Sequence, residues 1–328
     1  HIENKTGNML IRYMQDEVVA IIDPEKKGLT SNDVIQIGGD IPVVGSFNDT
    51  KKYRPDHLVI GNAPQGGIVS EQMLIEIKEA ITNGVNIVSG MHEFLSKNTF
   101  LKKLAKKSGS KIIDIRMPPN PPNFSKGSWR ERKIPVLLVV GTDCDTGKMT
   151  TAWEIKTRLS ALNKKVKFIG TGQTGVLLSD GVAIDAVISD FMSGEMENLI
   201  DTRVEGDTDL IIVEGQGALS NYAYSGVTLG LIHGCMPDYF ILTHDPSRSK
   251  DVMGHEIPDI NELMQLHIDL MSHFKRSSFI GINLLTFEMD KSIAKKTIKE
   301  FESLYKLPTA DLIRFGNSNL IESIYNLI

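Results

Sequence analysis

Residues 135–151 read PVLLVVGTDCDTGKMTT. Apolar and β-branched residues run up to Gly141, a loop containing Gly147-Lys148 follows, and residues 152–159 have a helical pattern. A strand, a glycine loop and a helix in this order bring main-chain N–H groups and a lysine to one point, which suits a phosphate group. We therefore predict a phosphate-binding loop made of Gly141, Thr142, Asp143, Cys144, Asp145, Thr146, Gly147, Lys148, Met149, Thr150 and Thr151.

The spacing within this loop is unusual. Five residues separate Gly141 from Gly147, one more than in the common pattern, and Met149 stands where a Ser or Thr normally binds magnesium. The longer form resembles the loop of dethiobiotin synthetases, a branch of the P-loop class. Because Met has no hydroxyl, Thr150 or Thr151 would have to serve a magnesium ion. The alternative is a chance Gly-Lys pair in a strand-to-helix turn.

Length and composition limit the classes of protein. A chain of 328 residues predicts two domains, and 41% hydrophobic with 23% charged residues is ordinary for a globular protein. A net charge of −5 with only short lysine clusters argues against a nucleic-acid partner, and the apolar runs are too short to span a membrane. No signal peptide is seen, and two cysteines without an expected disulfide indicate a reducing compartment. We expect a cytoplasmic homo-oligomer acting on a small molecule.

The first part of the chain alternates strands with helices. This pattern predicts a Rossmann-like parallel sheet over residues 1–117. A glycine turn at 62–67 and His92 follow strand ends, the edge where such sheets bind ligands. The Gly-x-Gly-x-x-Gly fingerprint of dinucleotide-binding domains is absent from this part of the chain. The segment faintly resembles coenzyme-A-binding Rossmann domains. The alternative is a scaffold domain that binds no ligand. Expected strands cover 18–23, 41–44, 58–61, 85–89 and 111–115, and expected helices cover 4–14, 71–82 and 95–107.

Residues 118–133 are rich in proline and predict a linker between the domains. The alternation resumes over 134–328, which predicts a P-loop NTPase-like, doubly wound α/β domain. The expected strands there are 135–140, 166–169, 209–214, 238–246 and 279–283. The expected helices are 192–202, 226–234, 259–274, 290–305 and 317–327.

Polar residues at strand ends converge on Lys148 in such a sheet. Glu214 closes a buried strand and is the best magnesium candidate, with a hydrogen-bond anchor as the alternative. Asp190 is the second magnesium candidate, unless its side chain caps the N-terminus of the following helix. Other candidates follow from position and type: Gln216 beside Glu214, Tyr222 as a substrate wall, and Arg248 for a carboxylate unless it is a surface arginine. His244 ends a strand at the same edge, and His233 is a candidate unless it only ends a helix.

Several segments together resemble one family. Residues 139–151, 214–217, 226–234, 237–238 and His244, with 18–23, 60–67, 89–95 and 114–116, are similar to D-glutamate N-acetyltransferases. The resemblance covers almost the whole chain. It implies a Rossmann-like domain followed by a P-loop domain, and Met149 after the lysine belongs to its pattern.

What the resemblance implies is acetyl transfer from acetyl-CoA to the amine of D-glutamate. Such a reaction needs a general base and donors to the oxyanion. The loop would hold phosphates of acetyl-CoA with Lys148 as counter-charge, and Arg248 or Arg116 would take a substrate carboxylate. His92 is a further substrate candidate, unless it is a capping or packing residue. The base candidates are Glu214, Asp190, His233 and His244. Two alternatives stay open: an ATP-dependent ligase or kinase with magnesium at Asp190 and Glu214, and a nucleotide or CoA sensor without turnover.

Overall fold

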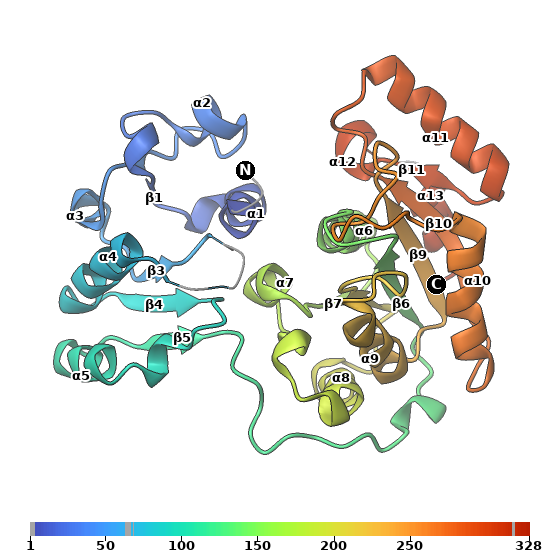
Figure 1. Cartoon of the computed structure of the whole chain (residues 1–328), viewed down its shortest axis with the longest axis horizontal. Helices are drawn as coiled ribbons and strands as arrows, with labels where there is room; N and C mark the ends of the chain where they lie inside the picture. The colour runs from blue at the N-terminus through green and yellow to red at the C-terminus, as the bar shows by residue number, and fades with distance from the viewer. Residues whose placement is uncertain (1–3, 63–66, 68, 317–318) are drawn as a thin grey trace. The chain divides into compact units, whose positions relative to one another are not determined.

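The computed structural model describes residues 4–62, 67, 69–316 and 319–328. The chain divides into two compact units, His1–Met117 and Pro118–Ile328, each with its own core (Figure 1). Within the described part of the chain, every helix is too short or too polar to cross a bilayer.

The first unit contains two parallel sheets. A two-stranded sheet pairs β1 with β2, and a three-stranded sheet has the order β3-β4-β5. Buried Ile77, Ile81, Ile87 and Leu101 join the helices to the larger sheet. This confirms the Rossmann-like parallel architecture. The elements are α1 Lys5–Tyr13, η2 Gln15–Glu17, β1 Ile21–Ile22, η3 Pro24–Lys26, α2 Ser31–Ile35, β2 Val43–Val44, α3 Phe47–Thr50, η4 Lys51–Tyr53, β3 His57–Val59, α4 Glu71–Thr82, β4 Asn86–Ser89, η5 Leu95–Lys97, α5 Thr99–Ser108 and β5 Ile112–Asp114.

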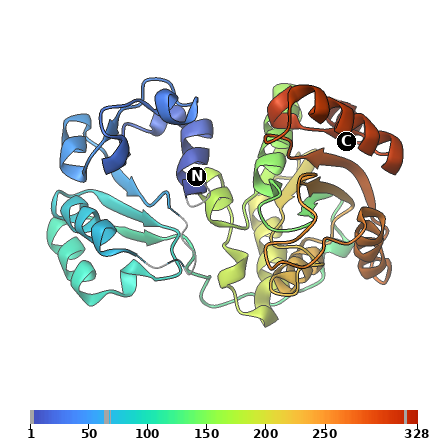
Figure 2. The same cartoon turned by 45° about the horizontal axis from the view of Figure 1, so that its top comes forward.

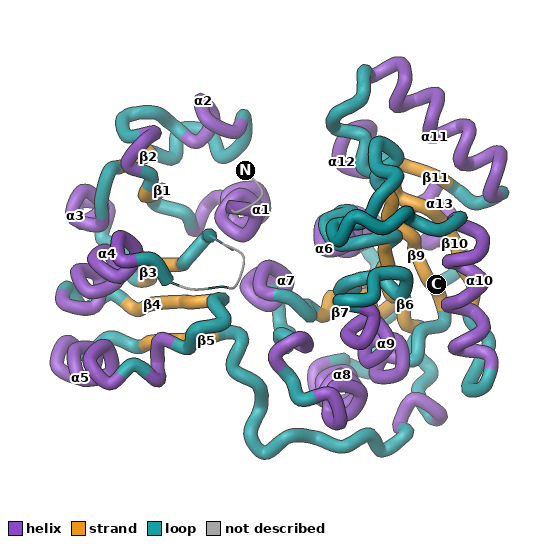
Figure 3. Tube along the Cα trace, in the orientation of Figure 1, coloured by secondary structure: helices purple, strands orange, loops and turns teal. Residues whose placement is uncertain are grey.

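The second unit is built on one six-stranded parallel sheet. Its order is β11-β10-β9-β6-β8-β7, so β6 lies in the interior between β8 and β9. Figure 3 labels β11, β10, β9, β6 and β7 of this sheet and draws the strands in orange. This confirms the P-loop-type doubly wound domain. The elements are η6 Ser128–Arg130, β6 Val136–Gly141, α6 Lys148–Ala161, β7 Val166–Ile169, α7 Gln173–Leu178, η7 Ile184–Ala186, α8 Ser189–Arg203, β8 Leu210–Glu214, α9 Ser225–Cys235, β9 Tyr239–His244, α10 Ile260–Ser272, β10 Ser278–Leu284, α11 Lys291–Tyr305, β11 Thr309–Ala310, α12 Leu312–Phe315 and α13 Asn319–Tyr325.

Helices cover both faces of this sheet (Figure 2). Along β6, Leu137 and Val139 pack with α6 and α13, whereas Leu138 and Val140 pack with α8, α9 and α10. Side chains alternate between the two faces of a strand, so a strand buried on both faces must be apolar throughout. That is why β6 reads as an uninterrupted hydrophobic run, and why the loop after it is held on a rigid support.

The proline-rich segment is fastened to α8. Glu195 accepts hydrogen bonds from the main-chain and side-chain nitrogens of Asn123 at 2.7 and 2.9 Å. Glu197 accepts from the Lys126 amide at 2.5 Å and from the Ser128 hydroxyl at 2.9 Å. A segment expected from composition to be only a connector is thus held by two buried carboxylates of the second unit.

Candidate functional site

The loop after β6 has the strand–loop–helix geometry expected for a phosphate site. Gly147 has φ 86° and precedes α6, which begins at Lys148 without a side-chain N-cap. A Cβ at Gly141 would lie 2.4 Å from the Thr146 hydroxyl oxygen and 3.0 Å from the Lys148 ammonium. Only glycine leaves room there for the loop to fold back over the strand end.

Lys148 lies inside this loop. Its side chain is only 8% exposed, and Nζ donates to the main-chain carbonyl of Asp143 at 2.6 Å. Burial lowers the pKa of the Lys148 ammonium, and the nearby Cys144, Asp145, Asp143 and Glu214 oppose that shift. The ammonium therefore sits at the centre of the loop, in the place from which a phosphate would be neutralised.

Asp143 is fully buried and joins the loop to two other segments. One oxygen accepts from the side-chain amide of Asn221 at 2.9 Å. The other accepts from the main-chain amide of Val252 at 2.7 Å and pairs with the guanidinium of Arg248. Arg248 also donates to the Cys144 carbonyl at 2.9 Å. Arg248, which we expected to take a substrate carboxylate, is thus engaged by a carboxylate of the protein itself; its role toward substrate stays a prediction.

Glu214 ends β8 beside this loop and is 4% exposed. Its Oε2 accepts from the main-chain amides of Thr171 and Gly172 at 2.9 and 3.1 Å, and its Oε1 accepts from the Gln216 side-chain amide at 3.2 Å. Burial raises the pKa of the Glu214 carboxyl, while these hydrogen bonds and Lys148 act in the opposite sense. The sequence prediction placed Glu214 and Gln216 together, and the structure brings them into contact.

The strand end of β9 closes the other side of the loop. His244 Nδ1 lies 3.0 Å from the hydroxyl of Thr142, and its ring stacks on Phe301. Burial lowers the pKa of His244 to about 4. Next to it, the hydroxyls of Thr146 and Thr243 lie 2.8 Å apart. His244 is therefore a neutral side chain in direct contact with the loop.

The helix start carries the residues considered for magnesium. Met149 is half-buried, directly after the lysine. Thr151 is 2% exposed, and its hydroxyl oxygen accepts from the side-chain amide of Asn283 at 2.9 Å. The same Asn283 accepts from the main-chain amide of Leu312 at 3.0 Å, which fixes the orientation of its amide.

Three other candidates lie on neighbouring helices or turns. Asp190 is exposed in the first turn of α8. His233 lies in the last turn of α9, with its ring 5.3 Å from that of Phe274, and burial lowers its pKa. Tyr222 is 67% exposed and contacts the ring of His255. The catalytic, metal and substrate roles of these three residues stay predictions.

The first unit holds the remaining two candidates. The guanidinium of buried Arg116 lies 3.5 Å from Nδ1 of the exposed His92, just past the ends of β5 and β4. The His92 main-chain amide donates to Gly67 at 3.1 Å. Residues 63–66 of the expected glycine turn lie outside the described residues. Arg116 and His92, predicted separately as substrate contacts, therefore form one pair.

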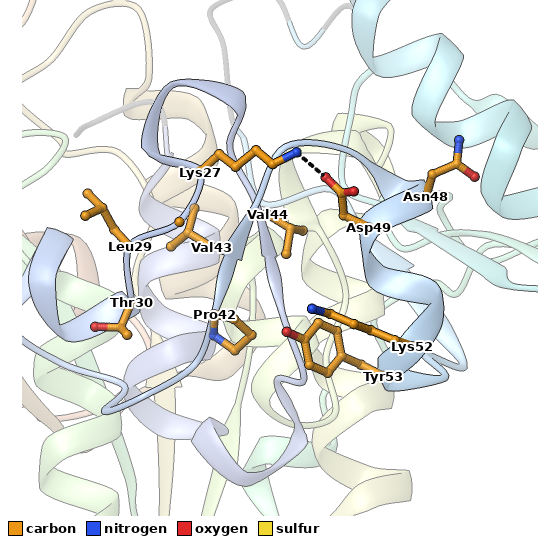
Figure 4. A pocket seen from close by; sticks show the side chains of 11 residues that line it. Lys27, Leu29, Thr30, Pro42, Val43, Val44, Asn48, Asp49, Lys52 and Tyr53 are labelled. Carbon is orange, nitrogen blue, oxygen red and sulfur yellow. Dashed lines mark hydrogen bonds and ion pairs between the residues drawn. The ribbon is translucent and has the colours of Figure 1, made fainter.

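A cavity of about 580 Å³ also lies in the first unit (Figure 4). Val43, Val44 and Pro42 form its apolar side, and a Lys27–Asp49 pair with a 3.0 Å separation lies along one wall. Lys52 lies beside the ring of Tyr53 at the other wall. Pro42, Val43 and Val44 fall in the expected strand 41–44, whereas Lys27, Asp49, Lys52 and Tyr53 belong to no sequence motif and were not predicted.

Two residues that organise the loop, Thr243 and Asn283, were missed, and Asn221 was expected only beside Tyr222 in a polar loop that forms a substrate wall. Asn221, Thr243 and Asn283 hold Asp143, Thr146 and Thr151 respectively. Each comes from a strand end or the turn after one, and the signal that could have identified them is a polar residue at the carboxyl end of a buried parallel strand.

Both units match models of known protein families. Residues 123–321 match the family model described as "Domain of unknown function (DUF1611_C) P-loop domain", and residues 24–118 match "Domain of unknown function (DUF1611_N) Rossmann-like domain". A crystal structure of a DUF1611 family protein from Anabaena variabilis superposes with a TM-score of 0.92 and 33% identity, over 98% of this chain and 95% of that one.

Two curated relatives carry a functional name. Each is called D-glutamate N-acetyltransferase, one from Tritonibacter scottomollicae and one from a Pseudoalteromonas species. Each is 35% identical to this chain over 283 residues, which is 85% of this chain and 84% of the relative.

Proposed function

Since the chain belongs to the DUF1611 family and shares a family with the two D-glutamate N-acetyltransferases, we propose that it transfers an acetyl group from acetyl-CoA to the amine of D-glutamate. The observation that carries this proposal is the likeness to those relatives over most of both chains. The geometry of the loop after β6 supports it, because Lys148 and the start of α6 suit the phosphates of acetyl-CoA.

In the proposed reaction the amine nitrogen attacks the thioester carbonyl carbon. The carbon–sulfur bond breaks, CoA leaves as a thiolate, and the proton lost by the amine ends on the thiol. A general base must take that proton within hydrogen-bond reach. Glu214 is the candidate that the geometry favours, because it lies beside Lys148 and burial raises its pKa toward the range in which a carboxylate accepts a proton effectively.

Capture of the substrate carboxylates is the second requirement. Arg116 is buried and lies against His92, so its guanidinium is held in one place by the protein. An arginine of this kind suits bidentate binding of a carboxylate. Both arginines stay candidates for this role: Arg116 in the first unit, and Arg248 in the second, whose guanidinium is paired with Asp143.

The experiment is thiol release by the purified protein with acetyl-CoA and either D- or L-glutamate, each with and without ATP and magnesium. We expect release without ATP and preference for the D isomer. ADP formation with no thiol release would place the protein among ATP-dependent ligases instead. Lys148→Met should abolish release, with exposed Lys299→Met as the matched control.

A further inference from the structure

We propose that the loop after β6 binds the phosphate groups of its ligand without a magnesium ion. The proposal rests on the proposed function only for the identity of the ligand. It concerns the charge balance of the phosphate site itself, and it follows from how the hydroxyls and carboxylates around Lys148 are occupied.

The first observation is the residue that follows the lysine. P-loop proteins bind magnesium through a Ser or Thr hydroxyl at that position. Met149 stands there, and a thioether sulfur is a poor ligand for magnesium, which prefers oxygen.

The second observation concerns Thr151, one of the two residues whose hydroxyl could have replaced the usual one. The oxygen of Thr151 accepts a hydrogen bond from Asn283 at 2.9 Å and is buried. Asn283 cannot turn its amide around, because its oxygen already accepts from Leu312 at 3.0 Å. A magnesium ion that displaced Asn283 from this oxygen would leave the Asn283 amide unpaired inside the protein, which is costly.

The third observation is the state of the nearby carboxylates. Both oxygens of Glu214 accept hydrogen bonds, from Thr171, Gly172 and Gln216. Both oxygens of Asp143 are likewise occupied, by Asn221, Val252 and Arg248. Asp190, the other candidate, is exposed on α8. Among the residues that the structure describes, no group of three or more His, Cys, Asp or Glu is arranged to hold a metal ion.

Groups of the protein, in place of a magnesium ion, would neutralise the negative charge of a phosphate. Lys148 supplies a full positive charge, and the N-terminus of the 14-residue α6 supplies main-chain donors and a favourable dipole. Acetyl transfer breaks no phosphoryl bond, so the phosphates need only be held. In phosphoryl transfer, by contrast, magnesium neutralises charge that develops during the reaction.

The test measures binding of acetyl-CoA and, separately, of ADP to the full chain by calorimetry, in excess magnesium and in EDTA. We expect the affinity of each probe to change by less than about twofold. A loss of about tenfold or more in EDTA would overturn the proposal. One variant extends the comparison: Met149→Ser, which restores the usual hydroxyl, should gain affinity for ADP in magnesium.

The outcomes separate this proposal from the proposed function. Binding of ADP alone, independent of magnesium, would remove the acetyltransferase and leave the metal-free site. Acetyl transfer that needs magnesium for acetyl-CoA binding would keep the enzyme and remove the metal-free site. If Lys148→Met binds both probes as tightly as wild type does, the loop is not the phosphate site and the proposal fails.

Discussion

Arg248 pairs with Asp143 across a separation of 105 residues and so ties the loop after β9 to the loop after β6. The same guanidinium donates to the carbonyl of Cys144 at 2.9 Å. Because Asp143 is fully buried, its carboxylate depends on this partner for much of its charge compensation. The pair is thus a structural part of the phosphate loop, whatever else Arg248 contacts.

We therefore expect Arg248→Ala to destabilise the second unit. Loss of one partner of a buried charge costs on the order of 3 kcal/mol in the free energy of unfolding. Urea denaturation measures this, with exposed Arg276→Ala as the control that should change little. A large rise in KM for D-glutamate with unchanged stability would show instead that Arg248 is mainly a substrate contact.

The fastening of residues 118–133 gives a second prediction. Glu197 is 3% exposed, and burial would raise its pKa, but the hydrogen bonds from Lys126 and Ser128 prevail and lower it. Glu197→Gln exchanges an acceptor for a donor opposite main-chain amides and should cost roughly 1–3 kcal/mol. Limited proteolysis should then cleave within 118–133 faster than in wild type. Exposed Glu205→Gln is the control, and equal cleavage of all three proteins would show that the segment is held by other contacts.

His244 predicts a dependence of stability on pH. Its folded pKa of about 4 lies below the ordinary 6.5, so the unfolded chain takes up a proton before the folded chain does. The stability contributed by neutral His244 is complete above pH 6.5 and is lost as the pH falls toward 4. The loss is on the order of 3 kcal/mol.

His244→Gln should reduce that loss, because glutamine does not titrate. The free energy of unfolding, measured between pH 7 and pH 4, should fall less steeply in the variant than in wild type or in exposed His273→Gln. His267 is also buried with a pKa lowered to about 4, so part of the slope should remain. Identical slopes in all proteins would contradict the assignment to His244.

Local sequence signals were sufficient for the supporting elements. Residues 71–82 were predicted as a helix and form α4 with the same bounds, because an apolar face follows Ser70, whose hydroxyl accepts from Met73. The β6 strand was likewise predicted from the sequence, because a strand buried on both faces requires a continuous apolar run. The glycine loop was predicted from its position directly after that run.

The features that the sequence did not predict depend on contacts between residues that are distant in the sequence. The strand at 166–169 was expected to run into a turn rich in glycine and threonine that ends at Gly175, yet residues 173–178 form α7. Gly175 is needed there because a Cβ would lie 2.1 Å from Oε2 of Glu214. In the same way, the pairing of Asp143 with Arg248 requires that β9 lie beside β6, and the strand order is not encoded in either segment alone.

Glu214 gives the prediction that bears most directly on mechanism. Glutamine fits its position: an amide oxygen can accept from Thr171 and Gly172 as Oε2 does, and the side chain of Gln216 can rotate to accept from the new amide. Glu214→Gln should therefore fold, with a change of less than about 1 kcal/mol in the free energy of unfolding. If Glu214 is the base, kcat should fall roughly 10²- to 10⁴-fold with KM nearly unchanged.

The dependence on pH distinguishes a base from an anchor. The folded pKa of Glu214 is raised above the ordinary 4.5, so the ionised form needed for proton transfer accumulates, and kcat/KM rises, as the pH passes upward through that raised value. Stability should move the other way, because above pH 4.5 the unfolded chain releases this proton first. Both trends should be absent in Glu214→Gln and present in Glu205→Gln. A variant that is destabilised but keeps wild-type kcat would leave Glu214 as the anchor of the turn at Thr171, and the base would then have to be sought at His244 or His233.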